Sequence, residues 1–434
     1  MRTSRLGSVA AFGLAAGLLL AGCGVGGGSA GGNSQQTVSS SAALSGSITF
    51  QTWSLKNATF TPYFTSLISS FEKLHPGTTI NWIDQPGANY PDKVTSQITS
   101  NSLPDVINLP PDIAHTVAKT GDLLDLTKND STIGQTYVAS GLAAYEYKDT
   151  GTGGDSFAFP WYLGTDVNYW NKAMLARDGL SASNLPTTLD ALIADAKIMH
   201  DRSGGKDYLM SRPPGLMDFA NAGAPLLDAA GTAFAFNTSA SVKVLQQYTA
   251  AYQAGYLPSD VLTSTYEGNS ALFLKQEVAW TTGGGNYIQS TEQTNPSLVS
   301  SIVPSAAIGT PPLYVQGISI SSKSKNLPLS LAFAEYLTNA ANQAAFIALA
   351  PGFEPGTQNA ASGSASGNAI GMQAEASAIA EKDVENGVNF TPPIWTDAMN
   401  TILNQQIALA MTGKESAQTA LDDAVKQANA LLSQ

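Results

Sequence analysis

The chain has 434 residues, of which 43% are apolar and 12% are charged, so it is long enough and apolar enough to form two or three lobes with cores. Its 33 acidic residues outnumber the 21 lysines and arginines, which gives a formal charge of −12 and excludes a nucleic-acid-binding protein. The single cysteine excludes a disulfide framework and a cysteine-based metal cluster.

Residues 1–22 form a predicted export signal. Arg2 and Arg5 supply its positive region, and the stretch from Val9 to Leu20 is apolar apart from small glycines. About a dozen apolar residues are too few to cross a bilayer, which needs about 20, so we expect a cleaved signal and not a transmembrane helix.

The unique cysteine directly follows this signal. The sequence Leu20-Ala21-Gly22-Cys23 resembles a bacterial lipobox, in which the cysteine thiol receives diacylglycerol before cleavage on its amino side. The alternative is a buried free thiol, but a cysteine between glycines at the end of an apolar signal has no core to enter. We therefore predict lipidation at Cys23, a flexible tether over residues 23–46, and a body held at the outer face of the cell membrane.

The body begins with alternating strands and helices. Residues 47–53 alternate apolar and polar side chains as a strand does, a helix follows that stops at Pro76, and residues 79–83 form a second strand. A short amphipathic helix over residues 93–100 leads to a third strand at 106–109. This order predicts an α/β fold with an open, largely parallel sheet.

The second half of the chain is mostly helical in its pattern. Thr187 and Asp190 are spaced as a capping box at the start of one helix, and another helix ends at Gly255. A pair of apolar helices is predicted within residues 326–349, and an amphipathic helix closes the chain. Residues 356–370, rich in Gly, Ser and Ala, are predicted to be a loop.

The motifs of common enzyme classes are missing from the sequence. His75, His115 and His200 are far apart, no zinc-binding H-E-x-x-H occurs, and there is neither a phosphate-binding P-loop nor a G-x-S-x-G nucleophile motif. We therefore expect no metal and no cofactor. A glycosidase needs only two carboxylates, so a lipoprotein glycosidase with paired carboxylates stays open as an alternative.

Eight segments between residues 47 and 432 follow one another in a recognisable order. They read ITFQTW, FEKLHPGTTINW, DKVTSQITSNSLPDVINL, GDLLDLT, FAFPWYLGTDVNYWNKAML, LPTTLDALIADAK, GISISSKSKNLPLSLAFAEYLTN and FTPPIWTDAMNTIL. In this order the chain resembles the extracellular solute-binding proteins of family 1, which are maltose-binding-protein-like receptors of ABC importers. It departs from that pattern at Trp170-Asn171, where Tyr-Asn is usual, and at Gly164, where maltose-type receptors carry an acidic sugar ligand.

The resemblance implies a two-lobed α/β fold of the periplasmic-binding-protein type II kind, with the solute in a cleft that hinge rotation closes. The implied boundaries give one lobe residues 47–158 and 318–352 and the other lobe residues 159–317 and 353–434. The chain is expected to cross between the lobes near residues 159–166, 313–317 and 352–357.

The resemblance also implies a function. We expect a lipid-anchored, monomeric receptor that captures a mono- or oligosaccharide and delivers it to the transmembrane subunits of an ABC permease, without catalysis. The low charge agrees with a neutral solute, because sugar faces stack on aromatic rings and sugar hydroxyls pair with carboxylates and amides. A non-sugar solute such as a glycerol phosphate or a polyamine stays open, although a phosphate would favour a cluster of cations, and the candidate loops contain none.

Five aromatic residues are candidates for stacking on the solute. Trp53 ends the first strand, and Trp161 and Tyr162 lie on the first crossing. Trp280 follows a predicted apolar strand and Trp395 stands at the start of a helix, and the resemblance places both where the family stacks sugar. For each residue, packing in a core or a hinge is the alternative role.

Three further positions are candidates for polar or close backbone contact. Asp112 follows the third strand, where the family often places a hydroxyl-binding acid, and its alternative role is an N-cap before Ile113. Asp166 lies on the first crossing, with a hinge hydrogen bond as the alternative. Gly283 begins a run of three glycines, where the backbone can approach a solute closely.

Overall fold

The computed structural model describes residues 36–39, 43–150, 156–358 and 371–432. The predicted signal at 1–22, Cys23 and most of the predicted loop at 356–370 lie outside these residues. None of the described helices combines the length and the apolar character needed to cross a membrane.

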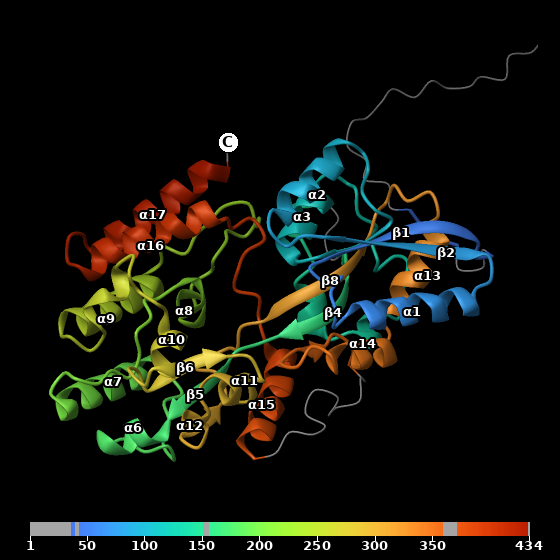
Figure 1. The fold of residues 1–434 in the computed structure, drawn as a ribbon. Coiled ribbons are helices and arrows are strands. Elements are labelled where there is room, and N and C mark those ends of the chain that lie inside the picture. The colour runs from blue at the N-terminus through green and yellow to red at the C-terminus, as the bar shows by residue number, and fades with distance from the viewer. Residues whose placement is uncertain (1–35, 40–42, 151–155, 359–370, 433–434) are drawn as a thin grey trace, which may run out of the picture. The chain divides into compact units, whose positions relative to one another are not determined.

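Two sheets organise the described chain, in agreement with the predicted two-lobed α/β fold (Figure 1). The larger sheet has the order β2-β1-β3-β8-β4-β9 and consists of β1 (Gly46–Trp53), β2 (Thr78–Gln85), β3 (Val106–Leu109), β4 (Phe159–Gly164), β8 (Tyr314–Ile320) and β9 (Glu354–Pro355). The smaller sheet has the order β6-β5-β7 and consists of β5 (Val167–Asn171), β6 (Trp280–Gly283) and β7 (Ile302–Ser305).

The larger sheet is mixed, so the prediction of a largely parallel sheet is wrong. β1 pairs in parallel with β2 and β3, as the first three strands led us to expect. β8 runs antiparallel to β3 and β4, and β9 runs antiparallel to β4. The two pairs of the smaller sheet are antiparallel as well. The local β-α-β pattern predicts only how strands that follow one another in the chain pair. It does not predict the direction of β8 and β9, which join the sheet from distant parts of the chain.

Helices cover both faces of the larger sheet. One face carries α1 (Thr61–Leu74), α13 (Leu327–Leu337) and α14 (Ala340–Ile347), and the other carries α2 (Tyr90–Thr99) and α3 (Pro111–Lys119) (Figure 1). Because strand side chains alternate, Phe50 and Val106 point into the first core while Ile107 and Leu109 point into the second. The short helices α4 (Ile133–Thr136) and α5 (Ala139–Ala143) and the 3-10 turn η1 (Lys148–Thr150) follow α3 in the chain.

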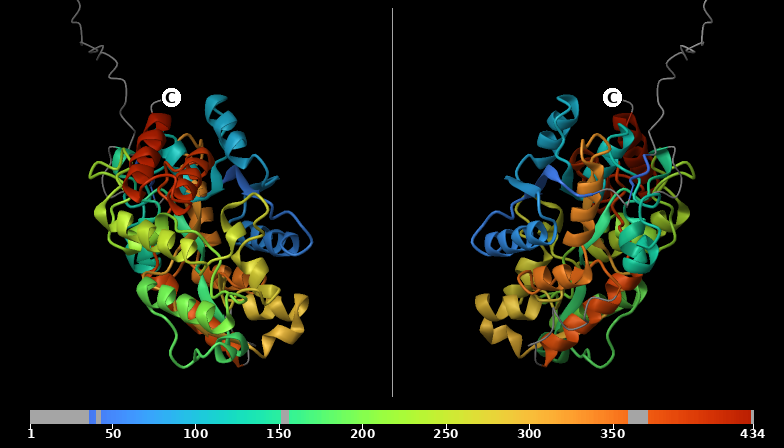
Figure 2. Two further views of the ribbon diagram at one scale, coloured as in Figure 1. Left: turned by 90° about the vertical axis from the view of Figure 1, so that its left-hand side faces the viewer. Right: turned by 90° about the vertical axis from the view of Figure 1, so that its right-hand side faces the viewer.

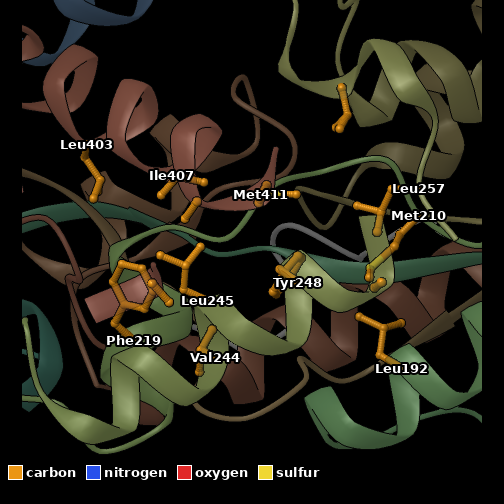
Figure 3. Packing of buried hydrophobic residues seen from close by; sticks show 14 of the residues in the cluster. Leu192, Met210, Phe219, Val244, Leu245, Tyr248, Leu257, Leu403, Ile407 and Met411 are labelled. Atoms are coloured by element: carbon orange, nitrogen blue, oxygen red, sulfur yellow. The ribbon is translucent and has the colours of Figure 1, made fainter. Parts of the chain in front are cut away.

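More helices surround the smaller sheet. They are α6 (Lys172–Arg177), α7 (Leu189–Ser203), α8 (Leu216–Asn221), α9 (Ser239–Gln253), the 3-10 turn η2 (Ser259–Leu262), α10 (Asn269–Leu274), α11 (Tyr287–Thr294), α12 (Pro296–Val299), α15 (Met372–Asn386), α16 (Asp397–Met411) and α17 (Ala417–Leu432). α16 and α17 pack against α9, which Figures 1 and 2 show from three directions. In Figure 3, Leu403, Ile407 and Met411 of α16 lie in a row opposite Leu245 and Tyr248 of α9. The predicted apolar helix pair and the predicted final helix are confirmed as α13, α14 and α17.

The predicted capping box of α7 is wrong by one residue. The helix begins at Leu189, and Thr188, not Thr187, accepts a hydrogen bond from the backbone N–H of Ala191 at 3.2 Å. Two adjacent threonines carry the same capping chemistry, so spacing alone does not separate them.

The chain passes between the two sheets where β4 leads into β5, between Gly164 and Val167, and returns between Ser305 and Tyr314. α15 packs against strands of both sheets. β4 and the start of β8 hydrogen-bond within the larger sheet, although the boundaries predicted at residues 159 and 317 give them to the other lobe. These two segments are the crossing strands themselves, and the exact lobe boundaries stay a prediction.

Part of the predicted tether at residues 23–46 contacts the folded body. The side chain of Asn129 donates a hydrogen bond to the backbone oxygen of Gln36 (3.0 Å) and accepts one from the backbone N–H of Val38 (2.7 Å). Val38 and Leu44 pack against the core beneath α1 and α13, and Gly46 already belongs to β1. We call residues 36–39 the docked segment.

Candidate functional site

Three strands bring polar and aromatic side chains together where the chain first crosses between the sheets. Gly164, the last residue of β4, pairs with Tyr314 at the start of β8. Val167, the first residue of β5, pairs with Gly283 at the end of β6. The crossing residue Asp166 therefore lies close to the start of β8 and the end of β6. We call Gly164, Asp166, Thr282, Tyr314 and Phe353 the junction site.

Asp166 is the carboxylate of the junction site. Its Oδ2 accepts hydrogen bonds from the Tyr314 hydroxyl (3.2 Å) and from the Thr282 hydroxyl (3.3 Å). Burial raises the pKa of the Asp166 carboxyl, while these two hydrogen bonds and the charge of Arg212 oppose the rise. Its Oδ1 has no hydrogen-bonding partner among the described residues, so one oxygen of this half-buried group is left to accept from a solute.

Two aromatic rings flank the crossing and are open to solvent. Tyr314 is 54% exposed and Phe353 is 38% exposed, which is unusual for rings of this size at the junction of two sheets. A Cβ atom added to Gly164 would lie 3.4 Å from the Phe353 ring and 3.7 Å from the Cβ of Tyr314. Phe353 and Tyr314 therefore both lie beside Gly164.

The carboxyl ends of the parallel strands form a second group of candidate contacts. Trp53 at the end of β1 stacks on Tyr90, with the ring centroids 5.6 Å apart and the planes inclined by 24°. The Trp53 ring is half-buried, and its Nε1 has no hydrogen-bonding partner within the described parts of the chain. Asp112 lies exposed in the first turn of α3, beyond the end of β3, and is not the N-cap of that helix, because Pro110 holds that position.

Three of the predicted aromatic contacts are packed in cores. Trp161 is fully buried against Phe64 of α1 and Phe346 of α14. Trp280 is 2% exposed and donates its Nε1–H to Asn168 at 2.9 Å. Trp395 is half-buried and meets Phe234 and Phe236 edge-on.

The structure places the remaining predicted residues closer to the crossing. Tyr162 stacks on Phe346 and contacts Phe353 edge-on, so it packs against one of the two exposed rings of the junction site. Gly283 adjoins Thr282, and a Cβ there would come within 2.6 Å of the Tyr287 ring. The structure thus places Asp166 and Gly283 at the crossing with Tyr162 packed against Phe353, whereas Trp161 and Trp280 are buried in cores and Trp395 packs against Phe234 and Phe236. As solute contacts, all eight residues stay predictions.

Tyr314, Phe353 and Thr282 were not among the residues singled out from the sequence. A signal for the first two was present, since Tyr314 lies within the predicted crossing at 313–317 and Phe353 within that at 352–357. Thr282 directly precedes the predicted Gly283.

Arg212 is a cation whose charge acts on Asp166, and this charge is already paired. Its guanidinium forms two hydrogen bonds to the carboxylate of Asp218, at 2.7 and 2.6 Å. It also lies over the ring of Trp280, 5.5 Å from the centroid. Because Asp218 neutralises it, Arg212 does not offer a free charge for an anionic solute.

The described residues hold no group of three or more His, Cys, Asp or Glu side chains with the arrangement of a metal site. The junction site therefore provides hydrogen-bond acceptors and donors and aromatic surface. Such a set of groups can bind a polar molecule by stacking and hydrogen bonding.

Comparison with known proteins places the fold. The family model described as bacterial extracellular solute-binding protein matches residues 57–344. A periplasmic-binding protein from Synechococcus sp. MITs9220 is 26% identical with a TM-score of 0.72, and the alignment covers 88% of this chain and 99% of that one.

Two more distant solved structures share the fold. The cyclic alpha-maltosyl-1,6-maltose binding protein from Arthrobacter globiformis is 19% identical with a TM-score of 0.70, over 89% of this chain and 99% of that one. The sugar-binding protein MalE from Xanthomonas citri is 18% identical with a TM-score of 0.71, over 89% and 97%. No curated protein matches the chain. The architecture is thus the two-lobed periplasmic-binding-protein-like one.

Proposed function

The chain belongs to the bacterial extracellular solute-binding proteins, and from this premise we propose that it is the receptor of an ABC importer, which captures a carbohydrate and delivers it to the transmembrane subunits of the permease. The receptor binds its solute without transforming it and acts as a monomer. Its relatives include proteins named for binding a cyclic maltosyl-maltose and for binding sugar, which supports a carbohydrate as the solute.

The observation that carries the carbohydrate assignment is the pair of exposed rings beside a carboxylate. Tyr314 and Phe353 offer aromatic surface to solvent, and Asp166 offers a carboxylate oxygen next to them. The C–H faces of a sugar ring stack on aromatic rings, and its hydroxyls donate to carboxylates. A sugar-binding site requires an aromatic stacking surface next to a hydrogen-bond acceptor.

Capture would proceed by closure of the two lobes on the solute. The junction site lies at the crossing, and Trp53 and Asp112 lie at the carboxyl ends of β1 and β3. A solute that contacts both groups binds the closed form more tightly than the open one and so shifts the equilibrium towards closure. The permease then recognises a liganded, closed receptor.

The alternatives are less well supported by the same residues. A glycerol phosphate needs a free cation, and Arg212 is paired with Asp218. A glycosidase needs two carboxyl groups about 5–10 Å apart at the sugar, and the junction site contains only Asp166. A polyamine carries several ammonium groups that need carboxylate partners, and the junction site contains one carboxylate, Asp166.

A sugar panel tests the proposal. Thermal unfolding and isothermal titration calorimetry of the purified body are measured with glucose, galactose, xylose, maltose, cellobiose and maltotriose. We expect at least one sugar to bind, and at about 100 times its Kd it adds about 2.7 kcal/mol to the free energy of unfolding. No reducing ends are expected to be released on long incubation. Absence of any binding, or turnover of an oligosaccharide, would overturn the carbohydrate-receptor assignment.

The anchor is tested separately by Cys23→Ser in the full chain. We expect the wild-type protein to fractionate with membranes and the variant to leave them, because two acyl chains give a stable hold and a serine accepts neither thioether nor anchor. Sugar binding by the released body should stay within about twofold of the wild type. A variant that still fractionates with membranes would contradict lipidation at Cys23.

A further inference from the structure

The side chain of Tyr314 extends across the junction site from Gly164 to Asp166. Its Cβ lies next to Gly164, and its hydroxyl donates to Asp166 at 3.2 Å. The hydroxyl has no second partner among the described residues, and more than half of the residue is exposed. A ring that is fixed at both ends and open between them can serve as a platform for a flat apolar surface.

Phe353 is the second exposed ring of the junction site and lies beside Gly164. A Cβ at Gly164 would be 3.4 Å from the Phe353 ring, and Tyr162 contacts that ring edge-on with 5.0 Å between the centroids. Phe353 therefore adds apolar surface to the junction site and no hydrogen-bonding group.

The charge of the junction site is negative and uncompensated by a free cation. Asp166 is its single carboxylate, Thr282 and Tyr314 contribute neutral hydroxyls, and the charge of Arg212 is satisfied by Asp218. A carboxylate or phosphate on the solute would meet the Asp166 charge in a partly desolvated place, where repulsion between like charges is stronger than in water.

We propose that Tyr314 and Phe353 are the stacking residues for the captured sugar, that Asp166 is its hydroxyl acceptor, and that this site selects a neutral sugar over the corresponding uronic acid. The inference rests on the proposed carbohydrate function and adds the selectivity against charged sugars. It assigns the stacking role to two residues at the chain crossings in place of the buried tryptophans Trp161 and Trp280.

The test compares variants by calorimetry with the neutral sugars of the panel and with glucuronic and galacturonic acid. Tyr314→Leu is expected to weaken the binding of the neutral sugar by about ten- to a hundredfold, because it removes the ring, and Phe353→Leu by about tenfold. Tyr314→Phe keeps the ring and should weaken binding much less than Tyr314→Leu. Asp166→Asn is expected to cost about ten- to a hundredfold, since it replaces a charged acceptor.

Two variants away from the site serve as controls. Tyr252→Leu removes a half-buried tyrosine of α9 whose hydroxyl bonds to Ser259, and Asp195→Asn removes a half-buried carboxyl of α7. Both should leave the Kd within about twofold, and the melting temperature of every variant reports whether it folds. The uronic acids are expected to bind wild-type protein at least tenfold more weakly than their neutral parents, and Asp166→Asn should reduce that difference.

The outcomes separate this inference from the proposed function. If no neutral sugar binds the wild type, the carbohydrate function fails and this inference fails with it. If a sugar binds but Tyr314→Leu and Asp166→Asn fold and keep its Kd within twofold, the residue assignment is wrong while the function stands. Equally tight binding of uronic acids and neutral sugars would show that the proposed selectivity is wrong.

Discussion

Glu354→Gln is expected to raise the free energy of unfolding by on the order of 3–5 kcal/mol at pH 9 and by only about 1 kcal/mol at pH 5. Glu354 lies on β9, opposite Leu163 of β4, and is 6% exposed. Burial, together with the nearby charge of Glu381 on α15, raises the pKa of the Glu354 carboxyl to about 8 from 4.5. The folded chain therefore holds this proton across the neutral range.

The direction of the pH dependence follows from that difference. Because the folded state binds the proton more tightly than the unfolded state, the stabilisation is complete below about pH 4.5 and is lost as the pH rises to about 8. The variant carries a neutral amide of the same shape and has no proton to lose. The gap between the two proteins should thus widen from pH 5 to pH 8 and then stay constant.

Thermal and urea unfolding at pH 5, 7 and 9 measure this gap. Glu385→Gln, an exposed position on α15, is the matched control and should differ from the wild type by the same small amount at every pH. Parallel pH profiles for wild type and Glu354→Gln would show that the Glu354 carboxyl is not perturbed.

Gly356→Ala is expected to destabilise the chain by about 3 kcal/mol or more, because the added methyl group has no room. A Cβ at Gly356 would lie 2.4 Å from the backbone oxygen of Pro160 and 2.6 Å from its carbonyl carbon. Backbone atoms of a paired strand cannot rotate away as a side chain can, so β9 has to move off β4. The hydrogen bond from the Gly356 N–H to the Gln343 side chain, at 2.6 Å, would be lost in that movement.

Gly134→Ala provides the control for the glycine variant. Gly134 lies in α4, and a Cβ there would meet nothing within 4 Å. Alanine in a helix is expected to be neutral or to stabilise by about 0.4–1 kcal/mol. Chemical unfolding of both variants separates the steric effect from the general effect of replacing glycine. A Gly356→Ala protein as stable as the Gly134→Ala protein would refute the steric argument.

Much of the fold could be predicted because its early elements obey local rules. Phe64, Leu67 and Phe71 recur at helical spacing and are buried, and the helix that carries them ends at Leu74 before Pro76. The antiparallel entry of β8 was not predictable in this way. Its direction is fixed by pairing with β3 and β4, about 200 and 150 residues earlier in the chain, and nothing in the local pattern of β8 encodes those partners.

The candidate site was harder to predict, because the exposure of a side chain depends on which residues pack around it in the fold. Trp161 and Phe353 are both aromatic residues on predicted crossings, yet α1 and α14 bury Trp161, whereas Phe353 stays 38% exposed. A tryptophan is the larger ring and the more obvious partner for a sugar, which favoured Trp161 on the sequence alone. Asp166 could be singled out as a candidate because its position on the crossing was visible in the sequence without knowledge of packing.

The hydrogen bonds of Asn129 with Gln36 and Val38 shorten the part of the chain that is free between the body and the proposed anchor at Cys23. An extended chain covers at most about 3.5 Å per residue, so Gly46 can lie at most about 80 Å from that anchor, while Gln36 can lie at most about 45 Å away. The volume available to the body scales with the cube of this distance and is smaller by roughly fivefold when the chain is fixed at Asn129. For the proposed importer, the effective concentration of receptor around a neighbouring permease is larger by the same factor. One asparagine side chain would thereby affect how often the proposed receptor meets its permease.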